Sequence, residues 1–340
     1  MVRIAINGFG RIGRLVARLA ATDESLVLTH INDPFVFKGG AESLPYAAYM
    51  FKRDTAQGDA DFDIEVIDGK FIINGQEVGY SACFKPEEIP FANNADYVVD
   101  STGIFKTVEK CQPHLQEGVK RVFISAPGDA NTPFYLYGVN HENITDEKVI
   151  SGTSCTTTCT SLPLKALLNA GIEIDRCMLT TIHAVTATQQ LVDSANFKKP
   201  RLGRSAMSNI IPSTTGASGA VTRVIPELTD KMTGISLRVP VITGSLVDIV
   251  IKTKNPTSVE EINAAFEAAA NGPLAGALEY STEELVSSDI IGSTYGSIVD
   301  GLCTTVLGED LVKCFFWYDN EASYTNNFVR LIKYVATKDF

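Results

Sequence analysis

A glycine-rich turn near the N-terminus constrains the fold of this chain more than any other feature. Gly8, Gly10 and Gly13 in NGFGRIG have the spacing G-x-G-x-x-G, directly after an apolar strand predicted over residues 4–6. The turn opens a predicted helix, and Asp33 follows Gly13 by twenty residues, at the end of the second predicted strand, SLVLTHIND. A strand, a glycine turn, a helix and an acid in this order predict a Rossmann, doubly wound sheet that binds a dinucleotide.

Each position of the turn has a physical role. Gly8 permits the tight turn, Gly10 lets the backbone approach a pyrophosphate, and Gly13 allows the helix to pack closely on the strand. The free N–H groups at the start of the helix then face the phosphates. Arg11 and Ile12, between the last two glycines, complete the predicted cofactor-binding loop.

Asp33 predicts which dinucleotide binds. A carboxylate at this position accepts hydrogen bonds from a ribose 2′-hydroxyl and repels a 2′-phosphate, so NAD is favoured over NADP. The alternative is a strand-turn-helix unit without a ligand, in which Asp33 only caps a loop.

Length and charge limit the other possibilities. A chain of 340 residues, 45 % hydrophobic and 20 % charged, suits a globular protein of two domains. The net charge of −11 argues against a general nucleic-acid binder, which needs a basic surface. The N-terminus resembles neither a signal nor a transit peptide, and no apolar run approaches the ~20 residues of a membrane helix. We expect no nucleic-acid or membrane partner.

The character of the sequence changes near residue 150. Strand and helix signals alternate before that point, whereas β-branched runs such as RCMLTTIHAVTAT dominate after it. A helix is expected over 161–170 and a long ordered loop over 193–209. An apolar stripe in the last segment, EASYTNNFVRLIKYVAT, predicts an amphipathic C-terminal helix that must be buried.

The stretch SGTSCTTTC at 151–159 raises the question of what Cys155 does. The seven cysteines are scattered, which suits a reducing compartment, and the cytoplasm is the simplest expectation. The nearest histidines, His141 and His183, lack the spacing of a zinc site, so no metal is expected. A disulfide with Cys159 is also disfavoured. Burial as an inert small side chain remains an alternative, and Cys159 fits that description.

A nucleophilic role for Cys155 is the other alternative. Ser154, Thr156 and Thr157 are typical of a helix start, where backbone N–H groups lower the pKa of a thiol. Pro163 suggests that this helix begins late or kinks. His183, at the end of the run TTIH, is a candidate base. Taken alone, a histidine in that place is as often structural as catalytic.

Several motifs together resemble phosphorylating glyceraldehyde-3-phosphate dehydrogenases. The motifs INGFGRIGR, IND, SCTTTC, HAVTATQ, NIIPSTTGASGAV, LRVP and WYDNE occur in the order seen in that family, over nearly the whole chain. The resemblance implies that Cys155 attacks the substrate aldehyde, that His183 is its base, and that a thioester is released by inorganic phosphate. It also implies a homotetramer in which the loop after His183 contacts a neighbouring subunit.

The resemblance also implies a fold and further binding residues. The expected fold is an NAD domain over 1–151, joined by a C-terminal helix within 319–340, and an α+β catalytic domain over 152–318 with a mixed, largely antiparallel sheet. The implied phosphate-binding residues are Ser154, Thr156, Thr186, Thr188, Arg201, Thr215, Gly216 and Arg238. The further implied cofactor-binding residues are Thr102, Gly103, Ser125, Asn320 and Tyr324.

Departures from the family pattern mark a divergent member. Thr158 replaces a common asparagine, Ala322 and Ser323 replace an aromatic residue and a glycine, and Phe84 begins FKP where Arg-Asp-Pro is common. Two alternatives remain. One is an erythrose-4-phosphate dehydrogenase, which uses the same residue types on a longer sugar. The other is a paralogue that keeps the fold for binding without catalysis.

Overall fold

The computed structural model describes residues 1–339 and divides into two compact units. The first comprises Met1–Tyr135, His141–Thr153 and the chain from Phe328 onward, and the second comprises Leu136–Asn140 and Ser154–Asn327. No helix in the described part of the chain is both long and apolar enough to cross a membrane. Within residues 1–339, no three His, Cys, Asp or Glu side chains are grouped to hold a metal ion.

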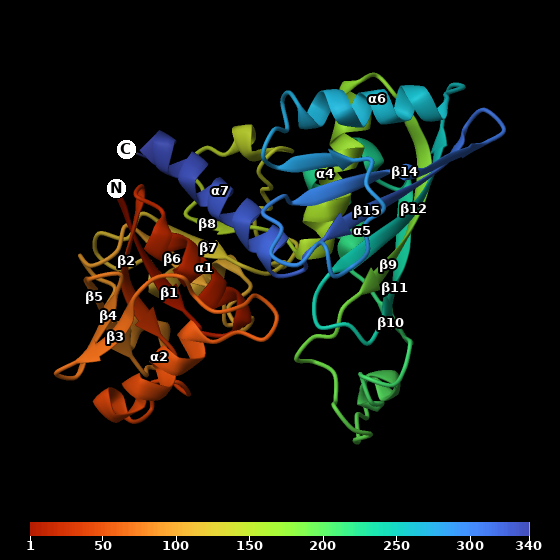
Figure 1. The fold of residues 1–340 in the computed structure, drawn as a ribbon. Helices are drawn as coiled ribbons and strands as arrows, with labels where there is room; N and C mark the ends of the chain where they lie inside the picture. The colour runs from red at the N-terminus through yellow and green to blue at the C-terminus, as the bar shows by residue number, and fades with distance from the viewer. Residues whose placement is uncertain (340) are drawn as a thin grey trace. The chain divides into compact units, whose positions relative to one another are not determined.

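The first unit is built on an eight-stranded sheet in the order β3-β4-β5-β2-β1-β6-β7-β8 (Figure 1). The strands from β5 to β8 in this order pair in parallel, whereas β3, β4 and β5 are antiparallel. The chain leaves β1 for β2 on one side and reaches β6 on the other, which is the switch point of a doubly wound fold. The strands are β1 Val2–Asn7, β2 Leu26–Asn32, β3 Ile64–Ile67, β4 Lys70–Ile73, β5 Gln76–Ser81, β6 Tyr97–Asp100, β7 Arg121–Ile124 and β8 Val149–Ser151.

Helical segments cover both faces of this sheet. Successive residues of a strand point to opposite faces, so Val98 and Val122 pack with Cys111 of α3, while Tyr97 and Phe123 face the other way. The predicted Rossmann fold is therefore confirmed. The helical segments of this unit are α1 Arg11–Thr22, α2 Leu44–Lys52 and α3 Val108–Cys111, with short 3₁₀ turns η1 Gly40–Ser43, η2 Pro86–Glu88, η3 Gln112–His114 and η4 His141–Asn143.

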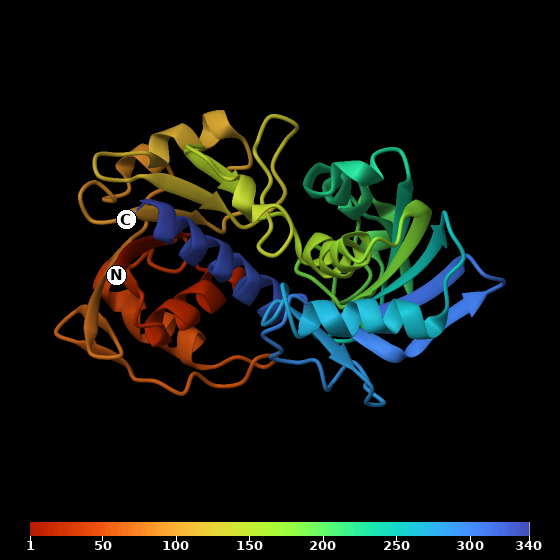
Figure 2. The ribbon, with the colours of Figure 1, turned by 90° about the horizontal axis from the view of Figure 1, so that it is seen from above.

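The C-terminal helix α7, Ala322–Asp339, ends on the first sheet, beside α1 (Figure 2). The carboxylate of Asp339 accepts hydrogen bonds from Arg121 Nη2 and Nε at 2.6 Å and from the hydroxyl of Tyr97 at 2.8 Å. The ring of Phe328 lies edge-on to Phe123, with centroids 6.5 Å apart. The last helix thus completes the core of the first unit.

The second unit contains a seven-stranded mixed sheet in the order β10-β11-β9-β12-β15-β14-β13. Four of its six strand pairs are antiparallel, and β11–β9 and β13–β14 are parallel, so the predicted largely antiparallel sheet is confirmed. Its strands are β9 Ile174–His183, β10 Ile211–Thr214, β11 Met232–Arg238, β12 Ser245–Thr253, β13 Leu278–Ser281, β14 Ser297–Leu307 and β15 Leu311–Tyr318.

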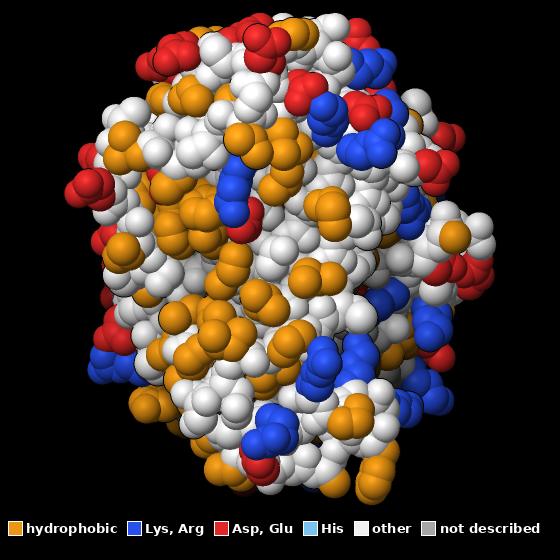
Figure 3. All heavy atoms as spheres, turned by 90° about the vertical axis from the view of Figure 1, so that its right-hand side faces the viewer, with side chains coloured by type: hydrophobic (Ala, Val, Ile, Leu, Met, Phe, Trp, Pro, Cys, Tyr) orange, Lys and Arg blue, Asp and Glu red, His pale blue; other side chains and the backbone are white. Residues whose placement is uncertain are grey.

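Helices of the second unit cover one face of this sheet (Figure 1). Helix α4 packs on β12, β14 and β15, α5 packs on β11, and α6 packs on β13 and β14. These helices are α4 Cys155–Asn169, α5 Ala217–Val224 and α6 Val259–Ala270, with 3₁₀ turns η5 Pro200–Gly203 and η6 Pro226–Leu228. Figure 3 shows hydrophobic side chains gathered on the side of the molecule where these strands lie.

Helix α4 begins earlier than the sequence indicated. We expected a helix over 161–170 and a late start because of Pro163, but the helix runs from Cys155 to Asn169 through Pro163. That expectation is wrong for a local reason. The Ser154 side chain caps the first turn by accepting the Thr157 N–H at 3.3 Å, and the Thr160 hydroxyl donates to the Thr156 carbonyl at 2.7 Å.

The long polar loop predicted over 193–209 is held together by its own hydrogen bonds. The Asp193 carboxylate accepts hydrogen bonds from Arg204 Nε and the Ser205 N–H, both at 2.9 Å. The Ser194 N–H donates to the Gly203 carbonyl at 2.8 Å. Phe197 at its tip remains 96 % exposed, so the loop presents an apolar side chain to solvent.

Candidate active site

The glycine turn has the geometry that a dinucleotide needs. Gly8 has a φ of +96°, and a Cβ there would lie 2.8 Å from the Thr102 nitrogen. A Cβ on Gly13 would lie 1.9 Å from the Gly8 carbonyl oxygen. Helix α1 therefore packs so closely against the turn that no side chain fits at Gly13. A Cβ on Gly10 meets no described atom within 4 Å. The space that Gly10 leaves open is where the backbone can approach a pyrophosphate.

Gly10 and Gly13 allow a paired test. Gly13→Ala should destabilise the protein by about 1–3 kcal/mol, since the added methyl group forces the helix away from the turn. Gly10→Ala should leave the melting temperature nearly unchanged but weaken NAD binding at least about tenfold, about 1.4 kcal/mol, because the methyl group fills the ligand's space. Thermal unfolding and NAD titration of both variants measure this. Equal NAD affinity in Gly10→Ala and the unmodified protein would contradict the assignment.

Asp33 is partly buried and organises the turn from the end of β2. One carboxylate oxygen accepts the Phe9 N–H at 2.9 Å, and the other accepts the N–H groups of Phe35 and Val36 at 2.9 and 3.0 Å. The loop-capping alternative therefore describes a real part of its role. A carboxylate has about four lone-pair sites, so capacity for a ribose hydroxyl remains.

The other predicted cofactor residues of this unit follow the carboxyl ends of neighbouring parallel strands. Thr102 and Gly103 come directly after β6, and the Thr102 hydroxyl donates to the Asp100 carboxylate at 2.7 Å. Ser125 comes after β7, where its hydroxyl donates to Ser101 Oγ at 3.1 Å. These positions share one edge of the sheet with the glycine turn, which is where ligands of doubly wound folds bind.

Cys155 is the first residue of α4. Thr153, two residues before Cys155, has a φ of +65°, a conformation that β-branched residues rarely adopt. Backbone strain of this kind costs about 1–3 kcal/mol and clusters at functional sites. The Ser154 cap then fixes the first turn, so the Cys155 thiol is held at the helix N-terminus.

Three strands that run in one direction bring the partners of Cys155 to one edge of the second sheet. β9 ends at His183, β11 ends at Arg238 and β15 ends at Tyr318. Arg238 pairs directly with His183 in the parallel register of β11 and β9. The Cys155 Sγ lies 3.5 Å from His183 Nε2, and the Arg238 Nη1 lies 2.6 Å from His183 Nδ1.

Burial dominates the electrostatics of this group. Burial and the Arg238 charge lower the pKa of His183 to about 3, so its imidazole is neutral at physiological pH. Burial also raises the pKa of the Cys155 thiol, although the Thr156 hydrogen bond and the Arg238 charge oppose that rise. The expectation that the helix start lowers this pKa is therefore not met, because desolvation outweighs the helix. The resting pair is a neutral thiol beside a neutral base.

Tyr318 is a member of the site that the sequence did not reveal. Its hydroxyl lies 2.9 Å from the Thr156 hydroxyl and 2.8 Å from that of Thr181, and its ring lies edge-on to His183. These contacts tie α4, β9 and β15 together beneath the thiol. The only signal in the sequence was its position before DNE, at the end of an alternating strand.

Asn320 is held in one orientation by β12 and the loop before it. Its Oδ1 accepts hydrogen bonds from Ser245 at 2.9 Å and from Thr243 at 3.2 Å. This arrangement turns the amide nitrogen away from those hydroxyls and makes it available to a ligand as a donor. Tyr324, another predicted cofactor residue, is buried in the first turn of α7.

The predicted phosphate-binding residues fall into separate groups. The Thr186 and Thr188 hydroxyls lie 3.0 Å apart in the loop that follows His183. Thr215 and Gly216 stand at the start of α5, where the Thr215 hydroxyl accepts the Ala217 N–H at 3.1 Å. Arg201 is exposed on η5 and lines an apolar hollow with Pro212 and Ile235.

The departures from the family pattern have structural roles of their own. Thr158 is buried, and its methyl group lies 3.0 Å from the place where a Cβ on Gly296 would be. The Ser323 hydroxyl accepts the Asp319 N–H at 3.0 Å and so fixes the start of α7. Phe84 is exposed and packs edge-on to Phe35, two residues beyond Asp33, with centroids 5.8 Å apart.

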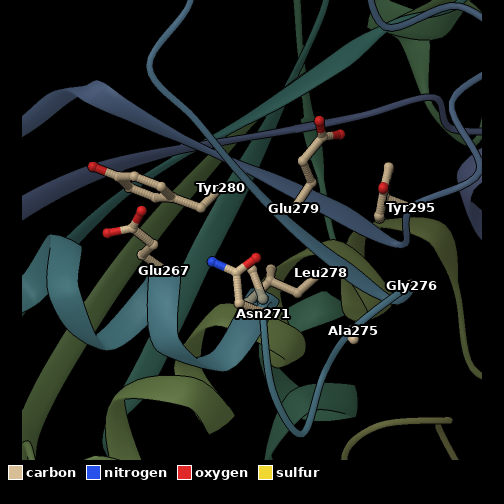
Figure 4. A pocket seen from close by; sticks show the side chains of 9 residues that line it. Glu267, Asn271, Ala275, Gly276, Leu278, Glu279, Tyr280 and Tyr295 are labelled. Carbon is tan, nitrogen blue, oxygen red and sulfur yellow. The ribbon is translucent and has the colours of Figure 1, made fainter.

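A second hollow of the same unit has a lining that includes neither Cys155 nor His183 (Figure 4). It is lined by the end of α6 and by β13, including Glu267, Asn271, Glu279 and Tyr280. Burial and the neighbouring Glu283 raise the pKa of Glu279. Its acidic lining does not fit a phosphorylated substrate, so it is not the candidate active site.

The doubly wound sheet and its glycine turn place this chain among the NAD-dependent dehydrogenases. Residues 2–108 match the family described as "Glyceraldehyde 3-phosphate dehydrogenase, NAD binding domain". Residues 154–320 match "Glyceraldehyde 3-phosphate dehydrogenase, C-terminal domain".

Full-length relatives agree with these matches. The chain is 44 % identical to "Glyceraldehyde-3-phosphate dehydrogenase 1" of Schizosaccharomyces pombe, over 99 % of this chain and 98 % of the relative. It is 44 % identical to "Glyceraldehyde-3-phosphate dehydrogenase" of Omphalotus olearius, over 100 % and 99 % of the two chains. The chain therefore belongs to the glyceraldehyde-3-phosphate dehydrogenase family.

Proposed function

We propose that this protein oxidises glyceraldehyde 3-phosphate to 1,3-bisphosphoglycerate with NAD and inorganic phosphate, in glycolysis or gluconeogenesis and in the cytoplasm. The observation that carries the proposal is the distance of 3.5 Å between Cys155 Sγ and His183 Nε2 at a capped helix start. A thiol next to a neutral imidazole is the arrangement of an activated nucleophile and its base.

The two residues act in sequence on the aldehyde. The Cys155 sulfur attacks the aldehyde carbon, and a thiohemiacetal forms. His183 Nε2 accepts the proton of its hydroxyl while hydride leaves the same carbon, and a thioester remains on Cys155. NAD, when bound, accepts that hydride. The Cys155 N–H at the start of α4 and the protonated His183 stabilise the oxyanion formed during oxidation and the oxyanion formed when phosphate attacks the thioester.

Hydroxyls and Arg238 serve the two phosphates. Thr186, Thr188, Arg201 and Arg238 bind the C3 phosphate of the substrate, because guanidinium and hydroxyl groups match phosphate oxygens. Inorganic phosphate binds beside the thioester on Ser154, Thr156, Thr215 and Gly216. Its attack on the thioester carbon expels the Cys155 thiolate and yields an acyl phosphate.

NAD fits the residues of the first unit. The open space at Gly10 admits the pyrophosphate, and Asp33 accepts the ribose hydroxyls. The oriented amide of Asn320, a residue of the second unit, serves the carboxamide. We assign residues 1–151 with the C-terminal helix to cofactor binding and residues 152–318 to catalysis.

NADH formation from glyceraldehyde 3-phosphate tests the proposal directly. We expect turnover with NAD that stops after one equivalent of NADH when inorganic phosphate is omitted, and little turnover with NADP because of Asp33. Faster, phosphate-independent oxidation of erythrose 4-phosphate would instead identify an erythrose-4-phosphate dehydrogenase. An absence of NADH with either sugar would indicate a paralogue that only binds its ligands.

The uncovered face of the second sheet supports a homotetramer. Alternation and strand register place a row of apolar side chains on the face opposite α4. The row consists of Met178, Ile182, Ile235, Leu237, Leu246, Val250, Phe315 and Trp317. The row is interrupted by Thr180 and by the Asp248–Lys313 ion pair, but Met178 and Ile235 remain exposed. An apolar surface of this kind marks an interaction site, and the exposed Phe197 of the 193–209 loop adds a second contact.

Light scattering at micromolar protein should give four times the chain mass of 36.7 kDa. Ile235→Glu, which introduces a charge on the apolar row, should lower that mass. Ile67→Glu, at a residue exposed on β3 of the other unit, is the matched control and should not lower it. A monomeric mass for the unmodified protein would refute the assembly.

A further inference from the structure

Two groups compete for one nitrogen of His183. His183 Nδ1 lies 2.6 Å from Arg238 Nη1 and 2.7 Å from the Ala184 carbonyl oxygen. The guanidinium can only donate, and the carbonyl can only accept. Nδ1 must therefore lack a proton to bond with Arg238 and must carry one to bond with Ala184. A neutral imidazole satisfies one of these partners at a time.

The choice determines what the opposite nitrogen offers to Cys155. When Nδ1 accepts from Arg238, the proton sits on Nε2, and His183 cannot take a proton from the thiol or the thiohemiacetal. When Nδ1 donates to Ala184, the lone pair of Nε2 faces Sγ, and His183 is a base. The second state requires Arg238 Nη1 to move away from Nδ1, because two N–H donors repel each other at 2.6 Å. Nη1 also donates to the Ala184 carbonyl at 3.2 Å, so Arg238 occupies the acceptor that Nδ1 needs as well.

From this geometry we infer that Arg238 holds His183 in the wrong tautomer until a phosphate group binds Arg238 and releases it. A phosphate oxyanion is a stronger acceptor than an imidazole nitrogen and takes guanidinium groups in bidentate fashion. The freed Nδ1 then donates to Ala184, and Nε2 becomes the base. Arg238 is thus a positioning residue for His183 as well as a phosphate ligand. This inference rests on the proposed function.

Few other groups near His183 can change its tautomer. The ionisable groups that face it are Cys155 on α4, Arg238 on β11 and Tyr318 on β15. Tyr318 bonds to Thr156 and Thr181, so its hydroxyl is engaged elsewhere. Arg238 is the group whose movement resets the tautomer.

Single-turnover oxidation of glyceraldehyde, which has no phosphate group, in phosphate-free buffer isolates the effect. Arg238→Leu should form NADH about tenfold faster than the unmodified enzyme, part of the ~10²–10⁴ that a general base contributes. With glyceraldehyde 3-phosphate the same variant should be slower, since it lacks a phosphate ligand. Arg176→Leu is the matched control, since Arg176 is exposed at the start of β9 and pairs with Asp175, and it should leave the glyceraldehyde rate unchanged. A glyceraldehyde rate in Arg238→Leu equal to or below that of the unmodified enzyme would overturn the inference.

Nitrogen NMR of the unmodified enzyme gives a readout that does not depend on the folding of Arg238→Leu. The chain has four histidines, so ¹⁵N-histidine labelling with His183→Asn for assignment is tractable. We expect the Nε2-protonated tautomer in the unliganded holoenzyme and the Nδ1-protonated tautomer after glycerol 3-phosphate is added. A separate titration with inorganic phosphate shows which source of phosphate releases His183. The same tautomer before and after both ligands would also refute the inference, whereas failure of the proposed function would show as an absence of NADH from glyceraldehyde 3-phosphate.

Discussion

We expect Cys155→Ser to abolish NADH formation from glyceraldehyde 3-phosphate. A hydroxyl has a far higher pKa than a thiol and is a weak nucleophile, and its ester retains less transfer potential than a thioester. Steady-state NADH absorbance and mass spectrometry of the trapped acyl-enzyme measure the loss.

Cys159→Ser is the matched control, one helical turn away on α4. The Cys159 sulfur is fully buried and lies 3.5 Å from the Ser297 hydroxyl and from the Phe316 carbonyl oxygen. A serine there finds the same partners, so we expect a loss of about 1 kcal/mol of stability and substantial remaining activity. If Cys159→Ser were inactive and Cys155→Ser active, the nucleophile would be wrongly assigned.

His183→Asn should lower kcat by roughly a hundredfold or more, which is the usual scale for the loss of a general base. Asparagine keeps a polar group near Ala184 but cannot accept the proton of the thiohemiacetal. The activity of the unmodified enzyme should also persist below the ordinary histidine pKa of 6.5, because the pKa of His183 is lowered to about 3 and its base form survives in acid.

The pH profile of kcat/KM tests whether activity persists below pH 6.5. A group with a lowered pKa loses its base form only as the pH falls through that lowered value, so no acid limb should appear near pH 6.5 from His183. An acid limb centred near 6.5 that disappears in His183→Asn would show that the imidazole is solvated during catalysis and would contradict the burial argument.

Local signals in the sequence were sufficient for the cofactor unit. The spacing of Gly8, Gly10 and Gly13 and the position of Asp33 depend on neighbours within one βαβ unit, so the predicted turn, helix and fold class could be read directly. The predicted late start of α4 was wrong because the helix begins at the Ser154 cap and continues through Pro163. An interior proline removes a hydrogen bond and clashes with the preceding turn, and the burial of most of α4 in the second unit offsets that cost.

The chemistry of the second unit depended on contacts that sequence spacing does not encode. Cys155 and His183 are brought together by the packing of α4 on the strands, and Arg238 reaches His183 only through the parallel register of β11 and β9. The residues themselves made Cys155 and His183 candidates, and the family resemblance added their roles and Arg238. The direct contact of Arg238 with His183, and the place of Tyr318, required the structure.

The closing contact of α7 on the first sheet has a consequence for how the chain is made. Domains generally fold as units while the ribosome synthesises the chain, with the N-terminal one first. Here the first unit lacks Phe328 and the Asp339 carboxylate for Arg121 until residues 328–339 have been translated. The second unit has all of its residues once Asn327 has emerged. The order of completion is thus inverted: the cofactor unit waits for residues 328–339, and until then Arg121 has the Thr145 and Glu147 carbonyls as partners but lacks the Asp339 carboxylate.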